Sequence, residues 1–144
     1  AIAKDNLGAT TTSSTVTVTV NAPPTVSLTA PSAGSLGTAP ASTTITANAA
    51  DADGTVAQVA FYAGATLLGT DSTAPYSFAW NNIAAGTYVL KAVATDDDGA
   101  TTNSSTVTVT VNAAPTVTIT APAAGLLGTA PYSTTISATA ADSR

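Results

Sequence analysis

Apolar and polar residues alternate with a period of two through most of this chain. From Thr106 to Val111 every second residue is Val and the others are Thr. Between positions 76 and 80, Tyr76, Phe78 and Trp80 alternate with small residues in the same way. A period of two places alternate side chains on opposite faces of a strand, and no window has the sustained 3.6-residue period of an amphipathic helix. The pattern therefore predicts an all-β protein.

The segment 24–111 reads as one unit of seven strands, separated by residues that favour turns. The expected strands are 25–30, 42–50, 56–63, 66–70, 76–80, 87–95 and 105–111. The tight turns Asp51-Ala-Asp-Gly54 and Asp96-Asp-Asp-Gly99 separate strands because Asp caps a turn and Gly accepts positive φ. The Gly- and Pro-containing segment 32–41 is expected to be a loop across one end. We predict an Ig-like or fibronectin-III-like antiparallel β-sandwich.

The chain repeats itself with an offset of 91 residues. When positions 1–53 are laid on 92–144, about 38 of the 53 aligned pairs are identical. A period of this length fits a string of Ig-sized domains and is too long for a solenoid. We predict the C-terminal strands of a preceding repeat in 1–22, a complete repeat in 23–112 and the N-terminal strands of a following repeat in 113–144. Pro24 and Pro115 stiffen the short joints, so we expect a semi-rigid rod.

Composition excludes several classes of function. Cys and His are absent, all eight acidic residues are Asp, and the formal charge is −5. Thiolate and imidazole nucleophiles, disulfides and the usual zinc sites are therefore excluded, and three basic residues are too few for nucleic-acid binding. No apolar run approaches the roughly 20 residues of a membrane span. We expect a non-enzymatic protein, located outside a bacterial cell or on its surface.

Six short motifs of the central unit carry a family resemblance. They are D-A-D-G at 51–54, F-Y-A-G at 61–64, L-L-G-T-D at 67–71, A-P-Y-S-F-A-W at 74–80, A-G-T-Y at 85–88 and A-T-D-D-D-G at 94–99. With them, the unit resembles the bacterial Ig-like domain of secreted and surface proteins, which also serves as a spacer in modular polysaccharide-degrading enzymes. The resemblance implies a scaffold without catalytic residues, with Tyr88 as a tyrosine corner. The chain departs from the motif at Asp142-Ser-Arg144.

Acidic turns supply the candidate metal site. Asp51, Asp53, Asp96 and Asp98 are expected at one pole of the sandwich, where carboxylates could hold Ca²⁺. The alternative is turn chemistry alone, because Asp followed by Gly is common in turns. In the first partial copy only Asp5 remains of the three consecutive acids. Asp51 and Asp98 could also be proposed as a glycosidase pair, but no apolar pocket is expected to raise one pKa.

Other side chains have both a structural and a functional interpretation. Tyr76, Phe78 and Trp80 share one sheet face and could bind sugar, but the unit needs them in its core. Tyr62 is the better candidate for an exposed ring. Asn103-Ser-Ser105 matches the N-glycosylation pattern, which is weak evidence in a bacterial chain. Lys91 is expected to face outward, without an isopeptide crosslink.

The sequence favours a structural repeat of an extracellular stalk or filament, used for adhesion. The apolar residues of the partial copies, among them Val16, Val18 and Ile119, would be exposed unless neighbouring copies supply the missing strands. The expected partners are therefore copies of the same repeat, with surface glycans or cell-wall polysaccharide as further partners. The alternative function is a spacer or carbohydrate-binding accessory module of a secreted polysaccharide-degrading enzyme.

Overall fold

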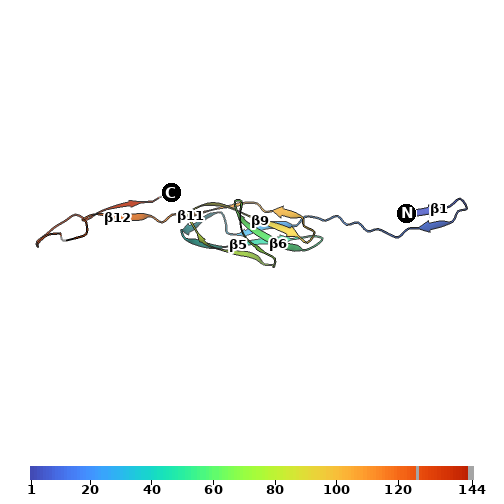
Figure 1. Ribbon diagram of the computed structural model, residues 1–144, viewed down its shortest axis with the longest axis horizontal. Coiled ribbons are helices and arrows are strands. Elements are labelled where there is room, and N and C mark those ends of the chain that lie inside the picture. Colours follow the sequence, from blue (N-terminus) through green and yellow to red (C-terminus); the bar gives the residue numbers. More distant parts are fainter. Residues whose placement is uncertain (126, 143–144) are drawn as a thin grey trace.

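Every regular element of the protein is a β-strand. The computed structural model describes residues 1–125 and 127–142, and Figure 1 shows an elongated molecule with a central body and an arm at each end. The arms contain β1 (Ile2–Lys4) and β2 (Thr10–Thr12) on the N-terminal side, and β12 (Thr116–Ala121) and β13 (Ser137–Ala141) on the C-terminal side. The strands of the body are β3 (Thr25–Ala30), β4 (Gly34–Thr38), β5 (Ala41–Ala50), β6 (Val56–Ala63), β7 (Thr66–Asp71), β8 (Tyr76–Ile83), β9 (Gly86–Asp96), β10 (Thr101–Asn103) and β11 (Val107–Asn112).

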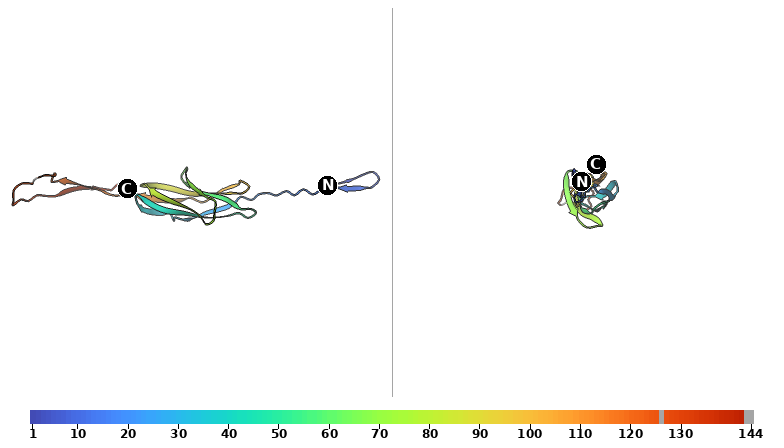
Figure 2. Two further views of the ribbon diagram at one scale, coloured as in Figure 1. Left: turned by 60° about the horizontal axis from the view of Figure 1, so that its bottom comes forward. Right: turned by 90° about the vertical axis from the view of Figure 1, so that its right-hand side faces the viewer.

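The central body is a sandwich of two sheets, which confirms the predicted fold class. The larger sheet has the order β4-β11-β9-β6-β7, with β10 also paired to β9, and the smaller sheet has the order β3-β5-β8. The pairings are antiparallel except that between β4 and β11, which is parallel. Both sheets run along the length of the molecule (Figure 2). The chain therefore enters the sandwich at one pole and leaves it at the other.

The core lies between the two sheets and follows the period of two. Along β9 the inward residues Leu90, Ala92 and Ala94 are fully buried, and the residues between them remain partly accessible. Small Ala side chains on β9 leave room for Phe61 on the neighbouring β6. The fully buried apolar side chains are Ile45, Val59, Phe61, Leu90, Ala92, Ala94 and Val109. Burial of such side chains is the main stabilising contribution to a fold without disulfides.

Two short strands were not predicted. The expected loop 32–41 contains β4, which pairs with the last strand of the body through Val109↔Gly34 and Thr110↔Ser35. Its Leu36 packs on the core, so the segment is part of the sandwich wall. The segment before the last strand contains the three-residue β10, which extends the antiparallel pairing of β9. The prediction of a plain loop across one end was wrong because a partner distant in sequence provides the pairing.

The aromatic residues of β8 belong to the core side of the sheet, as predicted. Tyr76 is buried, and Phe78 and Trp80 are half-buried because β8 is the edge strand of its sheet. Phe78 stacks on Phe61 with ring centroids 6.5 Å apart. A Cβ at Gly69 would collide with the Phe78 ring, so only glycine leaves room for the ring there. The sugar-binding interpretation of this strip is therefore not supported.

The two arms repeat parts of the body. The β1–β2 pairing Ile2↔Thr12 corresponds, at the offset of 91 residues, to Val93↔Asn103 between β9 and β10. The β12–β13 pairing Thr116↔Ala141 corresponds in the same way to Thr25↔Ala50 between β3 and β5. Even the register shift near the end of the second hairpin recurs. The predicted domain boundaries stay a prediction, but the repeat seen in the sequence is also a repeat of local structure.

Candidate functional site

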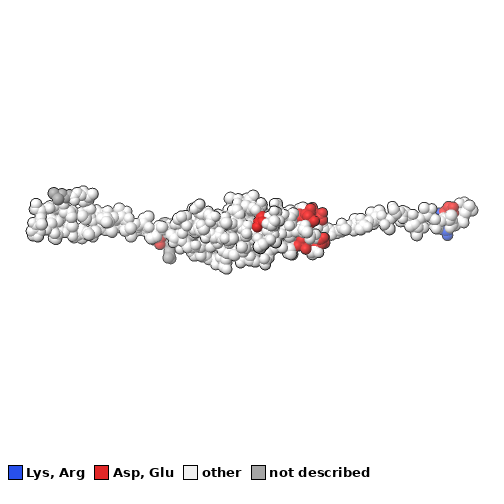
Figure 3. Space-filling view, turned by 90° about the horizontal axis from the view of Figure 1, so that it is seen from below, with Lys and Arg blue, Asp and Glu red and all other residues white. Residues whose placement is uncertain are grey.

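Five of the eight Asp residues gather at the pole where the chain enters the sandwich. They come from the β5–β6 turn and from the end of β9 with its following turn, and they are Asp51, Asp53, Asp96, Asp97 and Asp98. We call these five residues the acidic pole. In Figure 3 it is the cluster of acidic atoms beside the extended N-terminal arm, with no basic residue next to it on that face. We call residues 21–24, which lead from the arm into β3, the linker.

Asp96 joins its own turn to the linker. Its side chain is almost completely buried, with 2% of its surface exposed. Oδ1 accepts hydrogen bonds from the backbone N–H groups of Asp98 at 3.1 Å and Ala100 at 2.7 Å, which closes the turn. Oδ2 accepts a hydrogen bond from Nδ2 of Asn21 at 2.9 Å. The buried carboxylate is thus satisfied on one side by local backbone and on the other by a residue 75 positions earlier.

Asp53 and Asp97 accept hydrogen bonds from backbone. The N–H of Ala22 lies 3.0 Å from Oδ2 and 3.3 Å from Oδ1 of Asp53. Oδ1 of Asp97 accepts a hydrogen bond from the N–H of Thr55 at 2.9 Å. The Thr55 N–H group, together with Asp97's own N–H, lowers the pKa of the Asp97 carboxyl below its ordinary value, because both favour the charged form. These two carboxylates therefore organise the linker and the β5–β6 turn.

Asp51 differs from the other acids of the pole. Both of its carboxylate oxygens are shielded from solvent and have no hydrogen-bond partner. A Cβ at Gly54 would lie 2.7 Å from Oδ2 of Asp51 and 2.5 Å from Oδ1 of Asp97, so two carboxylates approach the same point. Glycine is required there because any side chain would collide with them. A shielded carboxylate without a donor is costly unless a proton or a cation neutralises it.

The four predicted metal ligands lie at one pole, but they are not arranged around one point. Within residues 1–125 and 127–142, no three or more Asp, Glu, His or Cys side chains form a group that could hold a metal ion. Asp53 and Asp96 direct oxygens at the linker donors. Calcium binding by Asp51, Asp53, Asp96 and Asp98 therefore stays a prediction. Sequence reasoning missed Asn21 and Ala22, although the recurrence of Asn-Ala at 112–113 was a usable signal.

The remaining candidates lie away from this pole. Nζ of Lys91 lies 5.2 Å from the centroid of the Tyr62 ring, a cation–π contact that covers the ring expected to be free. Asn103 of the predicted glycosylation pattern is exposed on β10. The hydroxyl of Tyr88 donates a hydrogen bond to the Ala84 carbonyl at 3.0 Å, which agrees with the implied tyrosine corner. Its ring meets Trp80 edge to face at 5.0 Å.

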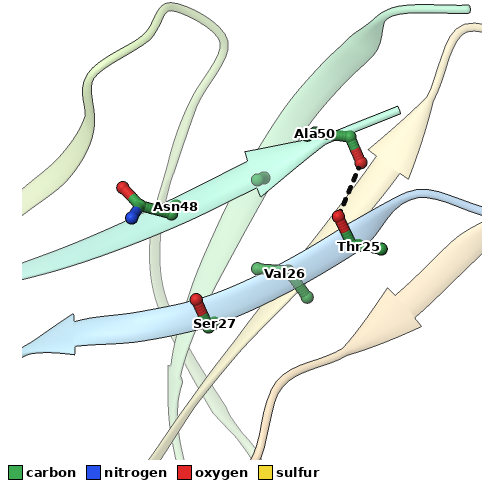
Figure 4. A pocket seen from close by; sticks show the side chains of 6 residues that line it. Thr25, Val26, Ser27, Asn48 and Ala50 are labelled. Atoms are coloured by element: carbon green, nitrogen blue, oxygen red, sulfur yellow. Dashed lines mark hydrogen bonds between the residues drawn. The ribbon is translucent and has the colours of Figure 1, made fainter. Parts of the chain in front are cut away.

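A depression over β3 and the end of β5 offers no chemistry. Figure 4 shows its lining residues, with the hydroxyl of Thr25 hydrogen-bonded to the Ala50 carbonyl at 3.0 Å. The lining consists of Thr25, Val26, Ser27, Asn48, Ala49 and Ala50. None of these side chains is charged or a nucleophile activated by a base. This depression therefore gives no support to a catalytic site.

The fold defines a β-sandwich module of the immunoglobulin-like class. The family described as "Bacterial Ig domain" matches residues 24–92, and the chain belongs to this family. Among solved structures, the fibronectin(III)-like modules of Clostridium thermocellum CbhA are 32% identical with a TM-score of 0.58, and the match covers 62% of this chain and 99% of the module chain.

A second solved structure is more distant. The PKD1 domain of Vibrio anguillarum Epp is 24% identical with a TM-score of 0.44, over 64% of this chain and 96% of that chain. None of the curated proteins matches the chain. Bacterial Ig and fibronectin(III)-like domains usually occur in extracellular or surface proteins and are typically non-catalytic structural or accessory modules. The part of the chain that the structure describes has no helix long and apolar enough to cross a membrane.

Proposed function

We propose that the protein is a non-enzymatic structural repeat of an extracellular bacterial stalk or filament, used for surface adhesion. The observation that carries the proposal is the recurrence of backbone pairing at the offset of 91 residues, on both sides of a complete sandwich. A chain that enters each unit at one pole and leaves at the other extends in one direction with every copy. Such a head-to-tail arrangement builds a rod without closing into a ring.

Neighbouring copies complete the partial units in this proposal. Val16, Val18 and Val20 are each at least 85% exposed in the N-terminal arm, and Val117, Ile119 and Ile136 are mostly exposed in the C-terminal arm. In the central body the corresponding residues Val107, Val109 and Val111 pack into the core. Unpaired strands with apolar faces recruit further strands, so copies of the same repeat are the expected partners.

Electron microscopy of the native protein, with intact mass from denaturing electrophoresis, tests the proposal. A fibre with a repeat near one domain length, built from a chain far larger than the 13.9 kDa of this sequence, is the expected result. A fibre built from a chain of about that mass would mean that the fibre consists of separate subunits that exchange strands, and not of covalent tandem copies. Single compact particles with an attached catalytic domain would overturn the filament proposal.

The second candidate function is a spacer or carbohydrate-binding accessory module in a secreted polysaccharide-degrading enzyme. The likeness to modules of CbhA favours it, because those domains are described as modules of a larger protein. Pull-down of the full-length protein on insoluble cell-wall polysaccharide distinguishes the two sugar-related roles. Retention that is lost in Tyr62→Ala supports a binding module, whereas no retention leaves a spacer.

Calcium remains the ligand proposed for the acidic pole. Asp51 supports it, because its two shielded oxygens have no protein donor, with Asp53, Asp96 and Asp98 as further oxygens. Bound only to the folded state, calcium at 100 times its Kd would stabilise the sandwich by about 2.7 kcal/mol. We expect a saturable rise of the Tm with calcium that Asp51→Asn abolishes. Equal Tm values in calcium and in chelator would exclude the site.

A further inference from the structure

We propose that the acidic pole of each unit is a docking surface for the linker of the preceding unit, and that the docked linker fixes the orientation of successive units. The partner is thus another copy of this repeat, recognised through the neutral Asn-Ala donors at its C-terminal exit. The inference rests on the tandem organisation proposed above. It adds the residues that make the joint between two units.

Three of four successive linker positions are held by the body. The side chain of Asn21 donates to Oδ2 of the buried Asp96 at 2.9 Å. The N–H of Ala22 donates to both oxygens of Asp53, and Pro24 is fully buried. Hydrogen bonds to a carboxylate are among the stronger ones in proteins, and proline removes φ freedom from the backbone. The linker is therefore held by the side chain of Asn21, the backbone N–H of Ala22 and the ring of Pro24.

The contact continues from the linker into the preceding unit. Thr19, Val20 and Asn21 line one cavity together with Asp53 and Asp98 of the acidic pole. Thr19 and Val20 correspond to Thr110 and Val111, which lie near the end of β11 in the complete unit. The pole thus faces the end of the preceding strand as well as the linker. A joint of this kind restricts the angle between units.

The N-terminal arm provides a natural comparison, because it contains a copy of this turn that no linker contacts among the described residues. Oδ1 of Asp5 accepts hydrogen bonds from Leu7 and Ala9 at 2.9 and 2.8 Å, as Oδ1 of Asp96 does from the corresponding residues of its own turn. No donor among the described residues reaches Oδ2 of Asp5. The turn therefore forms in the absence of a linker, and Oδ2 is the oxygen left over to accept one. Turn formation and linker docking use different oxygens of the same carboxylate.

The donors recur where the chain leaves the central unit. Asn112 and Ala113 correspond to Asn21 and Ala22, and the described residues give neither the Asn112 side chain nor the Ala113 N–H a hydrogen bond. Position 144, which corresponds to Asp53, is Arg in this chain. The outgoing linker thus carries the same donors but has no docking contact of this kind among the described residues. Two linkers of nearly identical sequence in one molecule differ in whether they are docked.

Amide hydrogen exchange measured by NMR on the 144-residue chain tests the proposal. We expect the Ala22 amide to exchange roughly 10-fold or more slowly than the Ala113 amide, because a hydrogen bond to a carboxylate must open before exchange. Asp53→Ala removes the acceptor and should raise the Ala22 rate toward that of Ala113. Asn21→Ala should raise it as well, by loosening the adjacent anchor. Asn112→Ala, the matched control, should leave Ala22 unchanged.

Two results would overturn the docking surface. One is an Ala22 rate equal to that of Ala113 in the unaltered chain, and the other is an Ala22 rate that neither variant changes. Asp53 and Asn21 are exposed, and the fluorescence of Trp80 reports whether each variant keeps the folded sandwich. A fast Ala22 amide in a protein that forms fibres would reject the joint and keep the filament. A slow Ala22 amide in a protein without fibres would keep the joint and reject the filament.

Discussion

The same six residues, Thr-Val-Thr-Val-Thr-Val, occur in the N-terminal arm at 15–20 and in the central unit at 106–111. In the central unit they contribute to β11, which pairs with β9 and β4, and Val109 is 0% exposed. In the arm they belong to no strand, and Val18, which corresponds to Val109, is 85% exposed. Identical sequence thus has opposite environments in one molecule. The alternation determines which side chains share a face, and only partner strands bury that face.

Turns behave differently from strands in this comparison. The turn after Asp5 has the same backbone and side-chain hydrogen bonds as the turn after Asp96, although one lies in an arm and the other in the body. Ser13 and Ser104 likewise donate to the carbonyl of the next residue in both places. These contacts span only a few residues, so local sequence suffices for them. Longer pairings require the rest of the sandwich.

The largest change in stability is expected at the pair of corresponding residues whose burial differs most between the arm and the central unit. Val109→Asp places an unpaired charge in the core and should destabilise the central unit by more than about 4 kcal/mol, a large part of the stability of a small domain. Val18→Asp, the matched variant in the arm, should change stability by no more than about 0.5 kcal/mol. Thermal unfolding followed by Trp80 fluorescence measures both. Similar Tm values for the two variants would mean that the arm is packed in solution.

A smaller loss of stability is expected when a serine that occurs in both the arm and the central unit is replaced. Oγ of Ser104 accepts a hydrogen bond from the buried N–H of Ala92 at 2.9 Å, in the gap between the stretches of β9 that pair with β10 and with β11. Ser104→Ala leaves that N–H unsatisfied and should cost about 1–3 kcal/mol in chemical denaturation. Ser13→Ala removes the corresponding hydroxyl of the exposed arm and should be nearly neutral. Equal losses for the two variants would contradict the difference in burial.

The sequence predicts the local features of the fold and only part of its long-range contacts. Alternation and Asp-Gly turns located the strands from β5 to β9 within a few residues, because both signals are local. The strand β4 was missed because Leu36 is the only large apolar residue between Gly34 and Thr38 and its pairing with β11 is not written in the segment itself. The gathering of acids at one pole followed from the topology of the predicted sandwich.

The contacts between the linker and the acidic pole could not be predicted from the sequence. Asn21 and Asp96 are 75 residues apart, and Asn is a common residue in any loop. Nothing in the neighbouring sequence indicates that Oδ2 of Asp96 remains available after its turn has formed. Val16 and Val18 are exposed because no strand of the described residues pairs with their segment. Both features depend on contacts between segments far apart in the sequence, which a local pattern does not contain.

The smallest change in stability is expected at Asp97, one of the two acids of the second turn that the first copy replaces. Asn6 occupies the position of Asp97 at the offset of 91 residues, so Asp97→Asn makes the turn of the complete unit resemble that of the arm. The pKa of the Asp97 carboxyl is lowered, by the Thr55 N–H first, even though four other Asp residues lie at the same pole. The backbone donors therefore outweigh the partial desolvation, which would raise the pKa.

A lowered pKa in the folded state defines the pH dependence of this contribution. The folded state binds the Asp97 proton more weakly than the unfolded state, so the stabilisation is fully present above the unfolded value near 3.9 and is lost as the pH falls through the lower folded value. In Asp97→Asn this pH dependence is absent. The pKa of Asp71 is also lowered, first by the N–H of Ser77, but this contribution is common to both proteins and cancels in the difference between their Tm values. The Tm of the unaltered protein should exceed that of the variant at pH 7, and the gap should close as the pH falls below the unfolded value near 3.9. Parallel Tm curves over this range would mean that Thr55 binds the amide oxygen of Asn as well as the carboxylate, so that the charge of Asp97 adds nothing to the turn.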